Sequence, residues 1–248
     1  MAKKFALIDK LEADLGWRKK EVTNLLLLEN EQNQLLILKS TLLLLYSHWE
    51  GFVKNASKAY LEHVSDKKIL IENLTDNFKA ITLKGLIKEV EKSSDTLTLS
   101  NELKFISKIN GSTNKPFTLK KGFSAQDKDK SIINTKDNLS LNIFKSILHV
   151  VGINYDDSID TKSKFIDEKL LESRNKVAHG AKIEKEDAQF NLSLEDLKEV
   201  KEVVFFLMDS LSDDLIYFAD NELYLSENSK LANKYLETRI DEVRNYLP

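Results

Sequence analysis

The sequence predicts an all-α protein, a helical bundle with a long N-terminal helical segment and an irregular insertion at about residues 93–140. The chain of 248 residues holds only seven glycines and two prolines, and its many Leu, Lys and Glu residues favour helix over strand. Apolar residues recur at helical spacing outside the insertion. Because 42% of the residues are hydrophobic, the chain can bury a substantial core, and we expect one domain over residues 1–248.

The first part of the chain carries the strongest helical signal. Residues 4–16 are amphipathic, and Gly16 is expected to end that helix. Residues 21–64 contain no proline and a single glycine, Gly51, which predicts one very long helix or two helices with a bend. A weaker helical pattern follows over residues 68–92.

The insertion at about 93–140 is rich in Ser, Thr, Asn, Asp and Lys, and it contains the turn dipeptides Asn110-Gly111 and Lys115-Pro116. The run Thr96–Leu99 is compatible with a small β-hairpin. No helix is therefore expected in this region.

Lysines dominate the charge of the insertion, with seven lysines against two aspartates between Lys104 and Lys130. One interpretation is a solvated loop, and the other is a segment that contacts phosphate groups. In the second case, the candidate RNA contacts are Lys115, Lys120 and Lys121.

Four helices are expected after the insertion, at residues 141–151, 163–179, 193–219 and 227–247. In the third, Ser193 is placed to cap the helix and Asp196 occupies the capping-box position. The apolar residues in its middle are expected to lie in the core or in a dimer contact: Phe205, Phe206, Leu207, Met208 and Leu215.

Composition excludes several classes of site and of location. The chain has no cysteine, so disulfides, thiolate nucleophiles and Cys-based zinc sites are absent. Its four histidines show no metal-ligand spacing and its glycines form no phosphate loop, so we expect no metal and no cofactor. The net charge of −3 gives no global basic field. No signal peptide and no apolar window of about 20 residues is seen, which favours a cytoplasmic protein away from membranes.

The segment Arg174–Gly180 places a permanent cation and a histidine at the end of a predicted helix. At about 100° per residue, Ile166, Leu170 and Val177 share one apolar stripe with Arg174 inside or beside it. A guanidinium is costly to bury unless it is paired. Arg174 therefore requires a partner, a wet cavity or a ligand.

Arg174 and His179 are five residues apart, so their directions from the helix differ by about 140°. Either the long arginine side chain curls toward the histidine, or a second copy of the helix completes a composite site. Asn175 and His179 are neighbours on another face, and Gly180 ends the helix. The alternative interpretation is structural, with Arg174 in an ion pair and His179 as a polar helix-end residue.

On these residues the chain resembles the HEPN superfamily of small helical bundles. The family motif is an Arg, usually followed by a polar residue, with a His four to six residues beyond, and Arg174, Asn175 and His179 match it. The segment Tyr46–Lys54 resembles the early helix of bacterial HEPN-like nucleases related to the RiboL-PSP-HEPN group. The fold that this implies is a HEPN-like helical bundle.

The resemblance implies a metal-independent endoribonuclease. An RNA 2′-hydroxyl would attack the adjacent phosphate, with His179 transferring protons, Arg174 clamping phosphate oxygens and Asn175 orienting either. Glu50 is a supporting candidate that would pair with Arg174, and the alternative is a surface glutamate. Some family members are silenced by nucleotide transfer to a tyrosine two residues after the histidine, a position that is Ala181 here.

The resemblance also implies partners and a biological setting. Its substrate would be RNA, and two copies would form a homodimer with a composite active site. The protein would be the toxic effector of a bacterial antiphage defence or toxin–antitoxin system, with an antitoxin or defence protein as partner. The alternative is a non-catalytic HEPN module that binds RNA, a nucleotide or a partner protein.

Overall fold

A computed structural model of the chain describes six ranges: residues 2–91, 99–126, 131–136, 138–155, 158–180 and 192–247. Within them the regular structure is helical and there is no sheet. Two isolated antiparallel bridges, Leu70 with Pro116 and Leu74 with Leu225, are the only β-type pairings of the described residues. The predicted all-α fold is confirmed.

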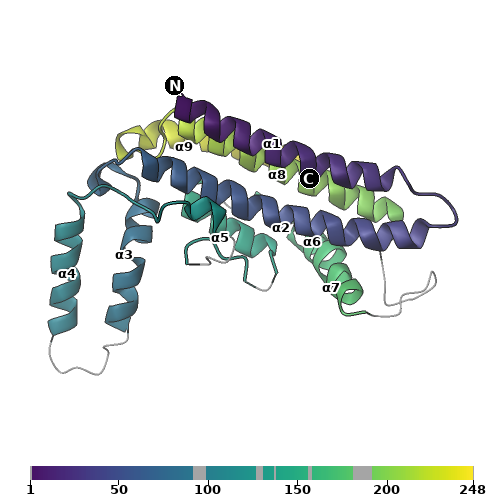
Figure 1. The fold of residues 1–248 in the computed structure, drawn as a ribbon, viewed down its shortest axis with the longest axis horizontal. Coiled ribbons are helices and arrows are strands. Elements are labelled where there is room, and N and C mark those ends of the chain that lie inside the picture. Colours follow the sequence, from purple (N-terminus) through teal and green to yellow (C-terminus); the bar gives the residue numbers. More distant parts are fainter. Residues whose placement is uncertain are drawn as a thin grey trace.

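Three long helices form the body of the molecule. α1 (Ala2–Leu26), α2 (Gln34–Asp66) and α8 (Leu194–Asp220) lie side by side along the long axis (Figure 1). α9 (Ser229–Tyr246) packs back on α8, where the ring centroids of Tyr217 and Tyr235 stack 3.8 Å apart.

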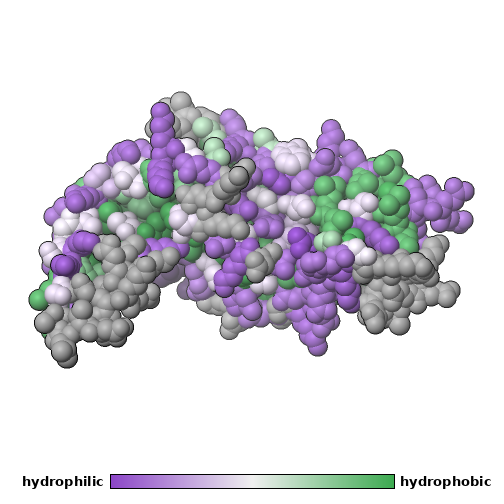
Figure 2. Space-filling model, turned by 60° about the horizontal axis from the view of Figure 1, so that its bottom comes forward, coloured by the Kyte–Doolittle hydropathy of each residue, from purple (hydrophilic) through white to green (hydrophobic). Residues whose placement is uncertain are grey.

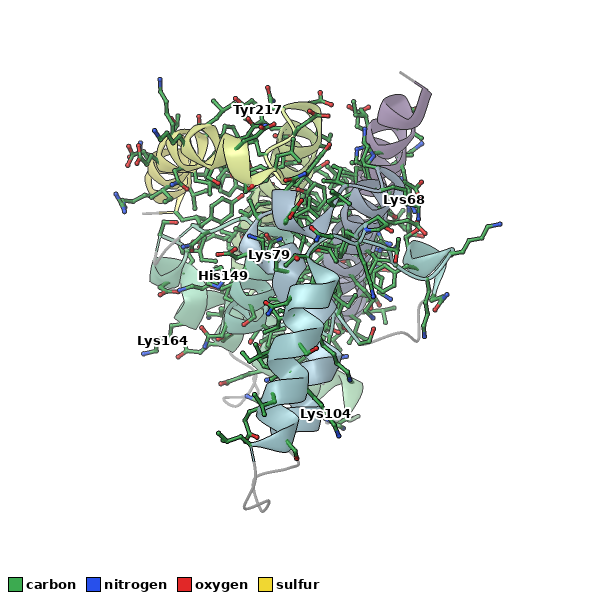
Figure 3. The ribbon with its side chains drawn as sticks, turned by 90° about the vertical axis from the view of Figure 1, so that its left-hand side faces the viewer. Lys68, Lys79, Lys104, His149, Lys164 and Tyr217 are labelled. Atoms are coloured by element: carbon green, nitrogen blue, oxygen red, sulfur yellow. The ribbon has the colours of Figure 1, made fainter. Side chains whose placement is uncertain are left out.

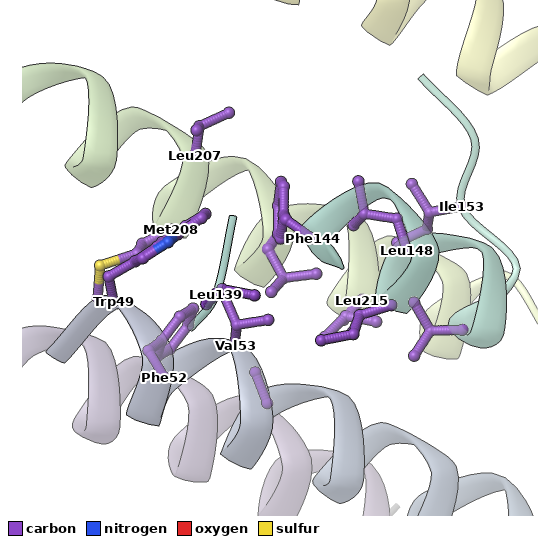
Figure 4. Packing of buried hydrophobic residues seen from close by; sticks show 14 of the residues in the cluster. Trp49, Phe52, Val53, Leu139, Phe144, Leu148, Ile153, Leu207, Met208 and Leu215 are labelled. Carbon is purple, nitrogen blue, oxygen red and sulfur yellow. The ribbon is translucent and has the colours of Figure 1, made fainter. Parts of the chain in front are cut away.

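Shorter helices cover the opposite side of α2. These are α5 (Leu141–Val151), α6 (Ser163–Ile166), the π-helical segment η4 (Asp167–Glu172) and α7 (Ser173–Ala178). In the core between them, Trp49 of α2 meets Phe144 of α5 with ring centroids 4.7 Å apart. Met208 of α8 belongs to the same buried cluster (Figure 4).

A helical arm projects from one end of this body. It consists of α3 (Asp76–Glu91) and α4 (Ser100–Ser112) (Figure 1). α4 lies inside the region where no helix was expected, so that prediction was wrong for residues 100–112. The Asn110-Gly111 dipeptide, taken as a turn signal, lies in the last turn of α4. Most of the proposed hairpin at 96–99 lies outside the described residues.

The first two helices differ from the sequence prediction in where they break. α1 continues through Gly16, and Gly51 lies within an unbroken α2, so neither glycine ends a helix. The break falls at residues 27–33. There the side chain of Asn30 accepts backbone N–H bonds from Gln32 and Asn33, at 3.0 and 3.2 Å. These local bonds compete with the helical ones and end α1.

The remaining helices follow the predicted ranges closely. α5 spans the predicted residues 141–151, and the capping box of Ser193 and Asp196 begins α8. Short 3₁₀ turns occur between the helices: η1 (Ile71–Asn73), η2 (Phe123–Ala125), η3 (Asp160–Lys162) and η5 (Ser226–Asn228). The predicted core role of the α8 side chains is confirmed for Phe205, Leu207, Met208 and Leu215, which are buried.

The surface is mostly hydrophilic on the face shown in Figure 2. An apolar area is visible at the end where α1 passes into α2, where Leu27, Leu28 and Leu36 are exposed. Among the described helices, none is both long enough and apolar enough to cross a membrane.

Candidate functional site

The helix that carries the Arg174 motif is not uniformly α-helical. It runs from Ser163 to Ala178, and its middle, Asp167–Glu172, is a π-helix. Two leucines of this segment, Leu170 and Leu171, are buried in the core. Arg174 follows directly after this segment. π-helical turns within α-helices are frequent at functional sites.

Arg174 is half-buried against α2, as its position beside the apolar stripe predicted. Its guanidinium carbon lies 4.4 Å from the ring centroid of Tyr46, which is a cation–π contact. Its Nη1 donates hydrogen bonds to the side-chain oxygens of Asn138, at 2.9 Å, and Asn175, at 2.8 Å. Both acceptors are neutral, so these described contacts orient the guanidinium without neutralising its positive charge.

No carboxylate of the described residues lies within ion-pair distance of Arg174. The prediction that Glu50 pairs with it was therefore wrong. Glu50 instead accepts a hydrogen bond from the Thr135 hydroxyl at 2.5 Å and lies 3.9 Å from the Lys54 ammonium. Glu50 and Lys54 are one turn apart on α2, and that local pairing competes with the longer reach to Arg174.

Tyr46 interacts with both Arg174 and Glu50. Its hydroxyl accepts the backbone N–H of Leu139 at 2.8 Å. Burial raises the pKa of Tyr46 to about 12, the Leu139 N–H and the Arg174 charge oppose that rise, and the carboxylate of Glu50 adds to it. Tyr46 therefore stays a neutral phenol at physiological pH and presents its ring to the cation.

His179 occupies the C-cap of α7 and is exposed. Its backbone N–H donates to the carbonyl of Asn175 at 3.0 Å, whereas its ring makes no hydrogen bond with the described residues. Gly180 then adopts a left-handed conformation with φ of 73° and ends the helix, as predicted. Ala181 lies outside the described residues.

The structure thus brings Arg174 and Asn175 together and leaves the His179 ring at the helix end. A cation held by neutral groups can bind an anion such as a phosphate. An exposed imidazole can transfer a proton to or from a bound substrate.

The lysines predicted to contact RNA fall into two groups. Lys115 is exposed after α4, where its carbonyl accepts the backbone N–H of Ile71 at 2.9 Å. Lys120 and Lys121 lie farther along and line a cavity at one end of α1 and α2. None of the three contacts Arg174.

Sequence reasoning missed two residues that position Arg174. Asn138 precedes α5 and has no pattern that links it to a helix 36 residues later. Tyr46 belongs to the segment that resembles the family's early helix, and that aromatic residue one turn before Glu50 was the available signal.

Comparison with known proteins gives a family but no individual relative. No curated protein and no solved structure matches the chain. The model of the MAE_28990-like HEPN family matches residues 7–224, which span α1 to the end of α8 and include the Arg174 motif. The chain therefore belongs to the MAE_28990-like HEPN family.

Proposed function

We propose that the protein is a metal-independent endoribonuclease. The 2′-hydroxyl of a ribose attacks the adjacent phosphorus, the P–O5′ bond breaks, and the products carry a 2′,3′-cyclic phosphate and a free 5′-hydroxyl. His179 transfers the proton at the 2′-oxygen or the 5′-oxygen. Arg174 stabilises the charge on the non-bridging oxygens, and Asn175 helps to orient the guanidinium.

The main support for this proposal comes from the contacts of the Arg174 guanidinium. Its guanidinium is half-buried and fixed by Tyr46, Asn138 and Asn175, yet it has no carboxylate partner among the described residues. A structural arginine at such a position would normally be neutralised, because a buried charge is otherwise costly. An uncompensated guanidinium in a fixed orientation suits a phosphate that carries its own negative charge.

The separation of Arg174 from His179 supports a homodimer. The two residues point about 140° apart on one helix, and the His179 ring makes no hydrogen bond or ion pair with the residues that the structure describes. Two copies of α7 around a two-fold axis would place the histidine of one near the arginine of the other. This predicts a mass near twice 28.5 kDa in light scattering, and a fully active monomer would contradict it.

We also propose a biological setting from membership of the family. The nuclease would act in the cytoplasm as a toxic effector of antiphage defence or of a toxin–antitoxin pair, held inactive by a partner protein. This part rests on analogy with other HEPN proteins and on no residue of this chain.

The test is RNA cleavage by purified full-length protein in EDTA. Wild type should cut RNA and leave 2′,3′-cyclic phosphate ends, whereas Arg174→Ala and His179→Ala should each slow cleavage by about 10²–10⁴-fold. Circular dichroism should show that both variants remain helical. Expression of each protein in bacteria, with growth and total RNA followed, tests toxicity in parallel.

The outcomes separate the nuclease from the second candidate, a non-catalytic RNA-binding module. If wild type binds RNA through Arg174 but never cuts it, the protein is a binding module. If cleavage survives both substitutions, the assigned residues are wrong. Strict dependence on a divalent metal would require another mechanism.

A further inference from the structure

A second polar site lies at the far end of the bundle from Arg174. A cavity of about 580 Å³ opens there between the beginning of α1, the end of α2 and the loop before η2. Its size falls within the range of small-molecule sites, about 300–1,000 Å³. Tyr46 and Ser65 are 19 residues apart on α2, which places the cavity roughly 28 Å from the Arg174 site.

Lysines from three separate segments converge on this cavity. Lys10 comes from α1, two lysines come from the end of α2, and two come from the loop; the last four are Lys67, Lys68, Lys120 and Lys121. Figure 3 shows Lys68 at this end of the body, well away from Lys104 on the arm. This cluster could not be predicted from the sequence, because its members are spread over more than 100 positions.

The charge of the lining is opposite to that of the chain. The lining contains five lysines and two carboxylates, Glu62 and Asp66, whereas the whole chain has a formal net charge of −3. The dipole of α1 favours an anion here and that of α2 disfavours one, since the two helices end at the cavity with opposite polarity. The net positive charge of the cavity lining therefore comes from the lysines.

Four of these five ammonium groups have no polar partner among the described residues. Lys67, Lys68, Lys120 and Lys121 form no side-chain hydrogen bond or ion pair with any residue that the structure describes, and all four are exposed. Lys10 donates to the Ser124 hydroxyl at 2.8 Å, and that hydroxyl bonds Glu62. The Glu62 carboxylate is thus hydrogen-bonded within the wall of the cavity, whereas the four other lysines are exposed to solvent.

The loop that carries Lys120 and Lys121 is held in place from below. The backbone N–H of Leu119 donates to the Ser65 hydroxyl at 2.8 Å, and the buried Lys58 donates to the carbonyl of Gln126 at 2.6 Å. Between these anchors, Gly122 takes a left-handed conformation with φ of 70°, and the N–H of Phe123 closes the turn on the carbonyl of Lys120 at 3.1 Å. The lysines are therefore displayed from a fixed turn.

We propose that this cavity binds phosphate groups, using Lys67, Lys68, Lys120 and Lys121, at a site separate from Arg174. The phosphates belong either to an RNA strand that continues from the Arg174 site or to a free nucleotide. The RNA source rests on the proposed function, whereas the nucleotide source does not. The described residues that line the cavity include no Phe, Tyr or Trp, and the one imidazole, that of His63, is buried, so recognition is directed at charge rather than at the base.

Binding to two probes tests the site without any cleavage. The first is a fluorescent 16-nucleotide 2′-O-methyl RNA, which lacks the attacking hydroxyl, followed by anisotropy at several salt concentrations. The second is ATP without metal, followed by calorimetry. The full-length pocket variants are Lys120→Gln/Lys121→Gln and Lys67→Gln/Lys68→Gln. The matched control, Lys230→Gln/Lys234→Gln, removes the same charge from exposed positions on α9.

Each pocket variant should weaken binding of one probe at least about 5-fold, and the control should change it less than about 2-fold. If RNA is the ligand, the slope of log K against log salt should fall by roughly 0.7 for each phosphate that the variant no longer neutralises. Weakening confined to ATP assigns a nucleotide site, and weakening confined to RNA assigns an extension of the substrate path. Equal effects of pocket and control variants, or no effect on either probe, would overturn the proposal. Because no step requires cleavage, failure here is separable from failure of the nuclease proposal.

Discussion

Two arginines pack against opposite sides of α2, and their surroundings differ. Arg18 of α1 is buried at 7% exposure, with its Nε 2.9 Å from a carboxylate oxygen of Asp14 and its Nη1 3.3 Å from Nδ1 of His48. Arg174 of α7 is half-buried and bonded to neutral amide oxygens. Both lie over an aromatic ring, Trp17 in one case and Tyr46 in the other.

The surroundings of the two guanidinium groups distinguish a structural arginine from one that is available to bind a ligand. An aromatic ring orients a guanidinium but leaves its charge in place, whereas a carboxylate neutralises it. Arg18 has both contacts and is closed off, since a Cβ on Gly51 would lie 2.7 Å from its Nη1. Among the described residues, Arg174 has only the ring and the amides. Burial alone would have ranked Arg18 as the more unusual residue.

The largest expected effect separates the two arginines by stability. Arg18→Ala should lower the free energy of unfolding by about 3 kcal/mol, because it leaves the partly buried Asp14 carboxylate without its cation. Arg174→Ala should cost about 1 kcal/mol, since it removes a cation–π interaction and neutral hydrogen bonds at a half-exposed site. Urea unfolding followed by circular dichroism measures both.

The control for this comparison is the double variant Asp14→Asn/Arg18→Ala, which should recover part of the missing stability. Equal destabilisation by the two single substitutions would remove the distinction drawn between the two arginines.

A third arginine, Arg239, extends the comparison to a fully buried carboxylate. Its Nε lies 2.8 Å from Asp214, which is also bonded by the hydroxyls of Tyr155 and Tyr235. Burial raises the pKa of Asp214 to about 6, although Arg239 and the Tyr235 bond oppose the rise. Because the folded pKa exceeds the unfolded value of 3.8, this group's contribution to stability is full below pH 3.8 and is lost as the pH rises through 6.

The variant Asp214→Asn isolates that contribution. The stability of wild type relative to Asp214→Asn should fall between pH 4 and pH 6, by at most about 3 kcal/mol. Urea unfolding of both proteins at pH 4, 5, 6 and 7 measures the difference and cancels the other titrating groups. A difference that grows with pH would mean that Arg239 outweighs the burial of Asp214.

The smallest expected effect concerns the ring beneath Arg174. Tyr46→Phe keeps the ring but leaves the Leu139 N–H without its acceptor, so it should cost about 1 kcal/mol of stability and change RNA cleavage less than about 3-fold. Tyr46→Leu also removes the cation–π interaction and should slow cleavage about 10-fold. Comparing cleavage rates of the two variants at matched folded fractions isolates the ring. Equal rates would show that the amides alone hold Arg174.

The elements that depend on local periodicity and capping could be predicted from the sequence. The all-α class, the ranges of α5, α8 and α9, and the capping box at Ser193 follow from residues a few positions apart. The end of the motif helix at Gly180 follows for the same reason, because glycine accepts the left-handed conformation at little cost. Single glycines at 16 and 51 did not end helices, since packing along α1 and α2 outweighs a cost of about 1 kcal/mol each.

The contacts between residues far apart in the sequence depend on how the helices pack and could not be predicted. Asn138 reaches Arg174 across 36 positions, and lysines from three segments gather at one cavity. The π-helical turn before Arg174 was likewise not predicted from the helical spacing of its apolar residues. Local sequence sets backbone preference over about one or two helical turns, whereas contacts between distant residues depend on how helices pack. The chain therefore specifies the motif in its sequence and the surroundings of the motif only through its fold.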